Sequence, residues 1–224
     1  MSFNIAIDGP AGAGKSTIAK KLAKKISFIY VDTGAMYRAM GYYFIQHGIA
    51  AEDEKAIEEA CGKIQVTLAY ENGVQKVLLN GTDISDKIRQ EEVGNMASAT
   101  SGYPFVRAKL LDLQRDMAAQ HNVIMDGRDI GTCVLPEAQL KVFLTASVEV
   151  RAKRRFDELT QKGENCDLDA IARDIKERDE RDMNREIAPL KAAEDAVMLD
   201  SSNLNIDEVV EAIYELAKKA GLEA

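Results

Sequence analysis

Gly9-Pro10-Ala11-Gly12-Ala13-Gly14-Lys15-Ser16-Thr17 is the stretch that decides how this chain folds. It matches G-x-x-x-x-G-K-[ST], a pattern in which glycines let backbone N–H groups curl around an anion. Residues 3–7 before it have the composition of a buried strand, and residues 17–25 after it place apolar side chains at helical spacing. A glycine-rich turn could match by chance, but strand, loop and helix in this order favour a phosphate-binding loop for a nucleoside triphosphate.

The end of this loop carries the two side chains that we expect to act on the triphosphate. Lys15 should reach the β- and γ-phosphates, and the Ser16 hydroxyl should ligate Mg²⁺. The helix that begins there adds its N–H groups and the positive end of its dipole. We therefore expect residues 9–17 to bind ATP, with Mg²⁺ as the cofactor.

Composition and charge indicate one α/β domain with small-molecule partners. The 224 residues are 46% hydrophobic and 29% charged, which is ordinary for a globular protein. The formal net charge of −8 argues against a nucleic-acid polymer as partner, because such polymers favour a basic surface.

The few cysteines and histidines exclude several kinds of site. Cys61, Cys133 and Cys166 are widely spaced and fit neither a disulfide framework nor a zinc site. His47 and His121 are too few for a histidine metal site or a catalytic triad. The chain begins with strand-like residues and has no apolar run of membrane-spanning length, so we expect no signal peptide and no membrane partner. We expect a cytoplasmic monomer.

Strand and helix patterns alternate along the chain. Apolar runs predict five strands, at 3–7, 28–31, 123–125, 140–144 and 197–199. Helical patterns follow at 17–25, from Thr33 onward, and at 53–61, 89–100, 104–120, 148–162, 168–185 and 206–220. This alternation predicts a five-stranded parallel sheet wrapped by helices. Ligands bind beyond the carboxyl ends of such strands, so we expect Gly9, Asp32, Arg128 and Asp200 along one rim.

One stretch, at about residues 63–90, breaks the alternation. Ile64, Val66 and Leu68 alternate with polar residues, and two Asn-Gly pairs, at 72–73 and 80–81, separate strand-like runs. Asn-Gly between such runs is typical of tight β-hairpin turns. We expect a small antiparallel hairpin or meander, inserted as a lobe.

Arginines gather in the two helices predicted after residue 148. Seven of the twelve arginines lie between Arg151 and Arg185. Helical spacing gives two faces, one with Arg151, Arg154 and Arg155 and another with Arg178, Asp182 and Arg185. The alternative is a solvated face with the pairs Asp174–Arg178 and Glu177–Arg181, and we accept it for Arg173 and Arg181. Because arginine binds phosphate oxygens bidentately, the other arginines on a helix pair with a glycine-containing tip suit a lid that closes over phosphates.

Four blocks of sequence together resemble the bacterial cytidylate kinase family. They are Ile7 to Thr17, Asp32-Thr33-Gly34-Ala35-Met36-Tyr37-Arg38, Asp126-Gly127-Arg128-Asp129-Ile130-Gly131-Thr132 and Lys176 to Arg185. The resemblance extends from the first strand to the last helix and includes the inserted β lobe. It implies a nucleoside-monophosphate kinase fold and transfer of the ATP γ-phosphoryl group to CMP or dCMP. It also implies a core (1–35, 104–150 and 186–224), an acceptor lobe (36–103) and a lid (151–185).

The resemblance implies a role for each site residue. The acceptor phosphate would be held by Arg38, Arg128 and Arg185, cytosine by Ser98, Arg107 and Asp129, and the ribose by Asp182. Thr33 and Tyr37 would belong to the same acceptor site, with threonine at a position where the family more often has serine. Arg151 and Arg155 would grip the triphosphate, and these two would act in catalysis together with Lys15, Arg128 and Arg185.

Two alternatives remain open at the level of sequence. A related kinase could use AMP, UMP or shikimate as acceptor, and a regulator could bind ATP without transferring a phosphoryl group. A GTPase is disfavoured because the chain has no Asn-Lys-x-Asp motif. Since a phosphate monoester is already anionic at neutral pH, a kinase of this kind needs no histidine as general base.

Overall fold

Five strands form the centre of the computed structural model, which describes residues 2–222. They are β1 (Asn4–Asp8), β2 (Ile29–Asp32), β6 (Val123–Gly127), β7 (Leu140–Thr145) and β8 (Val197–Asp200). Their order is β2-β6-β1-β7-β8, and each neighbouring pair is parallel. The parallel sheet predicted from the sequence is therefore confirmed.

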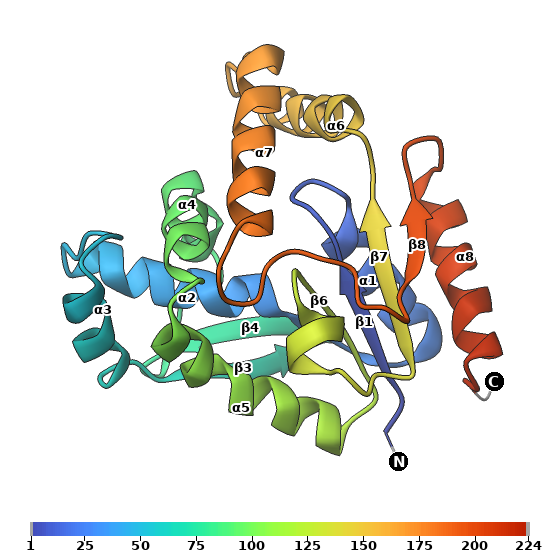
Figure 1. Cartoon of the computed structure of the whole chain (residues 1–224), viewed down its shortest axis with the longest axis horizontal. Helices are drawn as coiled ribbons and strands as arrows, with labels where there is room; N and C mark the ends of the chain where they lie inside the picture. The colour runs from blue at the N-terminus through green and yellow to red at the C-terminus, as the bar shows by residue number, and fades with distance from the viewer. Residues whose placement is uncertain (1, 223–224) are drawn as a thin grey trace.

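Helices cover both faces of this sheet (Figure 1), because the side chains of each strand alternate between the faces. On β1, Ile5 and Ile7 pack with α1 (Lys15–Ile26) and α8 (Ile206–Lys219). Ala6 belongs to the opposite cluster, with α2 (Thr33–Gln46) and α5 (Pro104–Gln120). Burial on both faces explains why the strands are nearly continuous apolar runs.

The carboxyl ends of the strands meet at one rim. Asp8 at the end of β1 pairs in register with Gly127, and Asp32 at the end of β2 pairs with Asp126. Across the sheet, Thr145 at the end of β7 pairs with Asp200. The rim predicted from the sequence is confirmed, and it is where the site described below is built.

The stretch at residues 63–90 is an antiparallel meander, as predicted. It consists of β3 (Val66–Glu71), β4 (Val74–Leu79) and β5 (Thr82–Asp83), followed by the short 3-10 helix η1 (Lys87–Arg89). The first hairpin turns at Asn72 and Gly73, both with positive φ, as a primed turn requires. The meander lies against β2, where the Gln75 side chain accepts from the Asp32 N–H at 2.9 Å. Two helices flank it along the chain, α3 (Glu54–Cys61) and α4 (Glu91–Thr100).

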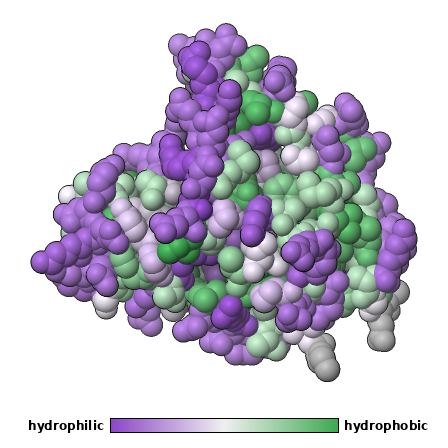
Figure 2. All heavy atoms as spheres, in the orientation of Figure 1, coloured by the Kyte–Doolittle hydropathy of each residue, from purple (hydrophilic) through white to green (hydrophobic). Residues whose placement is uncertain are grey.

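A helix pair, α6 (Val148–Gln161) and α7 (Leu168–Met183), stands over the rim (Figure 1). Its outer end is mostly hydrophilic (purple at the top of Figure 2). The predicted extension of α7 to Arg185 is wrong by two residues, because the Leu190 N–H bonds to the Asp182 carbonyl at 2.8 Å and draws the chain away from the helix axis. Arg185 therefore lies in the segment after α7. The π-helical turn η2 (Ile130–Val134) was not predicted.

Between residues 2 and 222, no helix combines the length and the apolar character needed to cross a membrane.

Candidate functional site

One open cleft of about 2020 Å³ lies at the rim, between the sheet, α4 and the α6–α7 pair. Pockets for a single small ligand commonly measure about 300–1,000 Å³, so this cleft has room for two nucleotides. Eighteen of the twenty site residues expected from the sequence line it; Gly9 and Pro10 do not. The lining residues among them are Ala11, Gly12, Ala13, Gly14, Lys15, Ser16, Thr17, Thr33, Tyr37, Arg38, Ser98, Arg107, Arg128, Asp129, Arg151, Arg155, Asp182 and Arg185.

The glycine-rich loop between β1 and α1 has the curled backbone that the pattern predicts. Gly12 and Gly14 have φ values of 75° and 88°, in the left-handed region. Gly9 is needed for a different reason, because a Cβ there would lie 1.9 Å from the Leu144 carbonyl oxygen. The loop is thereby packed against β7, and its residues 11–17 line the cleft.

Lys15 is buried at the floor of the cleft. Its ammonium donates to the Pro10 carbonyl at 2.7 Å, and no carboxylate of residues 2–222 forms an ion pair with it. Burial, followed by the charge of Arg128, holds the pKa of Lys15 well below its usual value. A buried cation without an ion-pair partner is suited to bind an incoming phosphate.

Asp126, at the end of β6, is a site residue that the sequence analysis missed. Its carboxylate accepts from the Ser16 hydroxyl at 2.8 Å and from the Tyr30 hydroxyl at 2.7 Å. Burial, followed by the charge of Asp32, raises its pKa. A hydroxyl at the end of the loop beside a strand-end carboxylate is the oxygen pair that holds Mg²⁺ in P-loop proteins. In the described chain no cluster of three His, Cys, Asp or Glu side chains could hold a metal, so phosphate and water oxygens would complete the coordination.

Asp182 lies between two of the expected acceptor arginines. Its Oδ2 accepts from Arg128 Nε at 2.9 Å, and its Oδ1 pairs with Arg185 at 2.7 Å. The Ser98 hydroxyl also donates to Oδ1, at 3.3 Å. Although burial raises the pKa of Asp182, the charges of Arg128 and Arg185 outweigh it and keep the pKa below its usual value.

Three arginines at the cleft keep a donor without a partner. The buried Nε atoms of Arg38, Arg178 and Arg185 have no hydrogen-bond acceptor. Such orphaned donors are uncommon and cost free energy, so they indicate a site for an anion. The sequence placed Arg178 on one helix face with Asp182 and Arg185 but gave it no role in the site. It lines the cleft, and the alternative pair with Asp174 does not form. Burial, followed by the charge of Arg128, lowers the pKa of Arg178 to about 10.

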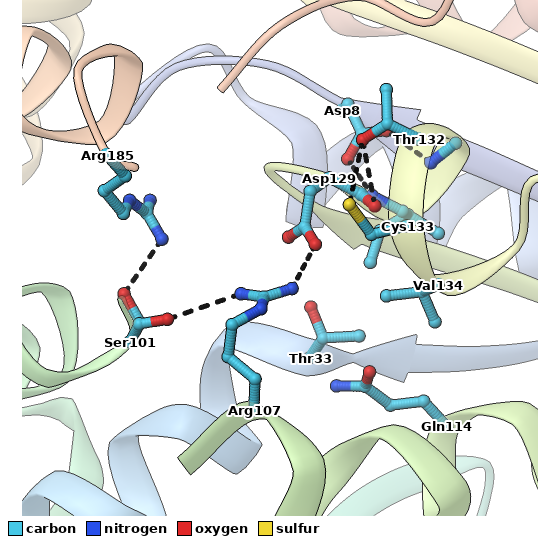
Figure 3. Close-up of polar contacts among 12 residues, drawn as sticks. Asp8, Thr33, Ser101, Arg107, Gln114, Asp129, Thr132, Cys133, Val134 and Arg185 are labelled. Atoms are coloured by element: carbon cyan, nitrogen blue, oxygen red, sulfur yellow. Dashed lines mark hydrogen bonds and ion pairs between the residues drawn. The ribbon is translucent and has the colours of Figure 1, made fainter. Parts of the chain in front are cut away.

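Arg107 and Asp129 form an ion pair deeper in the cleft (Figure 3). Arg107 also donates to the Ser101 carbonyl at 3.4 Å, and Arg185 donates to the Ser101 hydroxyl at 2.9 Å. Ser101 was not singled out from the sequence, because only the folded chain brings it between two arginines. Burial raises the pKa of Asp129, and the charge of Arg107 opposes this shift. The Tyr37 ring lies 5.8 Å from the Arg107 guanidinium.

The hydroxyls of Thr33 and Ser98 have protein partners. Thr33 Oγ1 donates to the Asp126 carbonyl at 2.7 Å, which ties the start of α2 to the end of β6. Ser98 faces Asp182, as described above, and not the Arg107–Asp129 pair. The structure therefore brings Ser98 to the cleft, on the side of the arginine cluster formed by Arg38, Arg128, Arg178 and Arg185.

The arginines of α6 differ in their surroundings. Arg151 is buried and donates to the Ala11 carbonyl of the loop at 2.9 Å, while the same Nη1 pairs with Asp179 of α7 at 2.6 Å. Arg155 is more exposed and pairs with Glu158 of its own helix at 3.0 Å. Arg154, which was not among the expected site residues, donates to the Ser201 carbonyl at 2.7 Å. Arg151 is thus the arginine of α6 that lies on the phosphate loop.

Comparison with known proteins gives a consistent result over nearly the whole chain. The family model described as Cytidylate kinase matches residues 5–219. A cytidylate kinase of Caldicellulosiruptor saccharolyticus is 52% identical over 217 residues, covering 97% of this chain and 96% of that protein. One of Halalkalibacterium halodurans is 48% identical and covers 97% and 98%. An uncharacterised protein from Eubacterium ventriosum has a solved structure with a TM-score of 0.52 at 12% identity, covering 97% and 99%, which shows a shared fold alone.

Proposed function

This chain belongs to the cytidylate kinase family and phosphorylates CMP and dCMP, and we propose how its cleft divides the two substrates. The triphosphate of ATP lies on residues 9–17, and the acceptor nucleotide lies across the cleft between the arginine cluster and the Arg107–Asp129 pair. In-line transfer requires both phosphates to meet near Lys15 and Arg128, which line the same cleft.

On the donor side, Lys15 contacts the β- and γ-phosphates through its otherwise unpaired ammonium. Ser16 and Asp126 would hold the Mg²⁺ that accompanies ATP, since the Ser16 hydroxyl already lies beside the Asp126 carboxylate and donates to it at 2.8 Å. The ion would neutralise charge on the phosphate oxygens. Arg151 lies over this side of the cleft, because its guanidinium donates to the Ala11 carbonyl.

On the acceptor side, one observation carries the proposal: Arg128 and Arg185 converge on a single carboxylate, with three orphaned guanidinium donors around them. Asp182 keeps these like charges together before the substrate arrives. The acceptor phosphate is held by Arg38, Arg128 and Arg185 and takes the orphaned donors of Arg38 and Arg185, and Asp182 then accepts from a ribose hydroxyl. The attacking oxygen is already anionic, so no general base is needed.

Arg107 and Asp129 read the base. Asp129 accepts from the N4 amino group of cytosine, and Arg107 donates to N3 and O2. Uracil would present O4 to the carboxylate and N3–H to the guanidinium, and each unpaired buried group costs roughly 1–3 kcal/mol. The ion pair between Arg107 and Asp129 supports this assignment against a pair of Asp129 with Arg128.

The remaining assignments concern the organisation of the chain. We propose that residues 36–103 form the acceptor lobe, residues 151–185 the lid, and the other segments the core. We also propose that the protein is a monomer. The three cysteines are free thiols, which supports a reducing compartment such as the cytoplasm.

Asp129→Asn tests the reading of the base. An amide can rotate to present N–H to O4 of uracil, so we expect kcat/KM to fall for CMP and the CMP:UMP ratio of kcat/KM to fall about tenfold or more. The ratio is measured from ADP release with each acceptor. Asp116→Asn, on the exposed side of α5, is the matched control and should leave both values unchanged.

A purely structural role for Asp129 predicts a different pattern. Activity would then fall in proportion on both acceptors, and the CMP:UMP ratio would stay at the wild-type value. That outcome would remove Asp129 from the specificity site.

A further inference from the structure

Asp8 is a buried carboxylate that none of the roles above uses. It is the last residue of β1, directly before the phosphate-binding loop, and only 4% of its surface is exposed. Its Oδ1 accepts from the Ile130 N–H at 2.8 Å, and its Oδ2 accepts from the Gly131 N–H at 2.7 Å. Figure 3 shows these contacts with the turn that follows Asp129. Both oxygens therefore bond to the turn after β6, which carries Arg128 and Asp129.

This segment depends on side chains from elsewhere for its shape. Asp129 has φ −147° and ψ 27°, outside regular structure, and η2 begins with the next residue. The first N–H groups of a helical turn have no partner within the turn, and Asp8 supplies one for two of them. At the other end of η2, Arg115 donates to the carbonyls of Cys133 and Val134 at 3.0 and 3.2 Å. The direction of the Asp129 side chain thus depends on these two anchors.

Asp8 is hydrogen-bonded to the turn after Asp129 and not to Lys15. Lys15 is a charged neighbour, but it donates to Pro10 and forms no ion pair with Asp8. Gly131 lies next to the carboxylate, since a Cβ there would be in van der Waals contact with Asp8 Oδ2, at 3.4 Å. Burial raises the pKa of Asp8 to about 6, so keeping a charge there is costly.

We propose that Asp8 is a positioning residue for acceptor selection, which holds the Ile130 and Gly131 N–H groups and so fixes how Asp129 faces the base. The carboxylate also joins the phosphate-binding loop to the turn after Asp129, because Gly9 of the loop follows Asp8 directly. This inference rests on the proposed reading of cytosine by Asp129.

Asp8→Asn is the first test. The amide keeps one acceptor oxygen and turns its NH₂ group toward an N–H, so one of the two bonds is lost. We expect KM for CMP to rise about tenfold and the CMP:UMP ratio of kcat/KM to fall at least about fivefold, while KM for ATP stays within about threefold. Asp83→Asn is the matched control: Asp83 also ends a strand and accepts two bonds, from Ser85 at 2.9 and 2.6 Å, but it lies in the meander.

A double-variant cycle separates positioning from general stability. If Asp8 acts through Asp129, Asp8→Asn should cause no further loss of the CMP:UMP ratio in an Asp129→Asn background. Additive losses of the ratio would overturn the inference, as would Asp8→Asn raising KM for CMP and ATP equally at an unchanged ratio. An unchanged ratio in Asp129→Asn alone would instead refute the proposed reading of the base by Asp129.

Gly131→Ala keeps the test decisive if Asp8→Asn does not fold. The backbone at Gly131 lies outside the left-handed region, so alanine is allowed there. The added Cβ would lie 3.1 Å from Cδ of Lys141, whose ammonium is held by Asp195 at 2.8 Å. Relief of this contact shifts the turn relative to Asp8 without changing any charge. We expect the same fall of the CMP:UMP ratio, and an unchanged ratio in this folded variant would count against the inference.

Discussion

Burial raises the pKa of the carboxylates in the cleft, and neighbouring positive charge lowers it. Asp8 and Asp126 have raised pKa values because burial is the largest influence on them. Asp182 is as deeply buried, yet its pKa is lowered because two guanidinium groups contact it. The difference matches the proposed roles, since Asp182 must remain ionised to hold the arginines together.

The raised pKa of Asp8 predicts how stability changes with pH. The folded value of about 6 lies above the ordinary 3.8, so the folded state holds a proton that the unfolded state releases. This contribution is present below about pH 4 and is lost as the pH rises through 6, and it amounts to roughly 3 kcal/mol. As the pH rises through this window, the free energy of unfolding measured with denaturant should therefore fall for the wild type relative to Asp8→Asn. Asp129 and Lys15 face Asp8 in both proteins, and parallel curves would contradict the assigned pKa.

Some site residues could be predicted from the sequence, and others could not. The loop residues and the arginines near strand ends were identifiable, because a local motif or a helix face marks them. Asp126 carried a usable signal, since it ends the strand after which Arg128 was expected at the rim. Ser101 was missed because its neighbours come from distant segments, and sequence spacing shows only local neighbours. Arg178 carried a usable signal, since it shares a helix face with Asp182 and Arg185.

At the scale of elements, the α6–α7 pair is fastened to the phosphate loop by one arginine. Arg151 of α6 bonds to the Ala11 carbonyl and to Asp179 of α7, whose other carboxylate oxygen is buried without a partner. A triphosphate on the loop would compete with Asp179 for this guanidinium. The pair is therefore suited to change its contacts when ATP binds.

We predict that the tip of this pair and residues 151–155 are mobile without ligand and become ordered with both substrates bound. Hydrogen exchange of residues 150–170, with and without a bisubstrate analogue, measures the difference. Asp179→Asn should increase exchange in the free protein and leave protection in the complex unchanged. Asp157→Asn, which breaks the exposed pair with Lys153, is the control. Equal protection with and without the analogue would contradict closure.

Local sequence patterns predicted the bounds of some helices and strands and not of others. Helices such as α5 were predicted to the residue, because Pro104 marks the start and apolar spacing the length. The meander followed from its two Asn-Gly turns. The end of α7 and the turn η2 could not be predicted, because bonds from distant residues, such as Asp8 and Arg115, determine them.

For the whole molecule, the parallel sheet brings four separate blocks of sequence to one rim. The phosphate loop, the start of α2, the turn after β6 and the end of α7 all line one cleft. The strand–helix alternation predicted this edge, but the pairing of Asp182 with Arg128 and Arg185 depends on how α7 is placed over it. A cleft of this size, cationic on its acceptor side and open to solvent, fits two anionic nucleotides.

The most direct measurement of this account is ADP release from ATP with CMP, dCMP, UMP, AMP and shikimate as acceptors, in the wild type and in Lys15→Ala. We predict that CMP and dCMP have the highest kcat/KM, and that Lys15→Ala lowers kcat at least about 100-fold with an unchanged Tm, because a charge on the transferring phosphoryl group loses its partner. Binding of ATP without acceptor-dependent turnover, or a higher kcat/KM for another acceptor, would contradict the account. A fall of kcat below about tenfold in Lys15→Ala, equal to ~1.4 kcal/mol of barrier, would contradict the role of the phosphate loop.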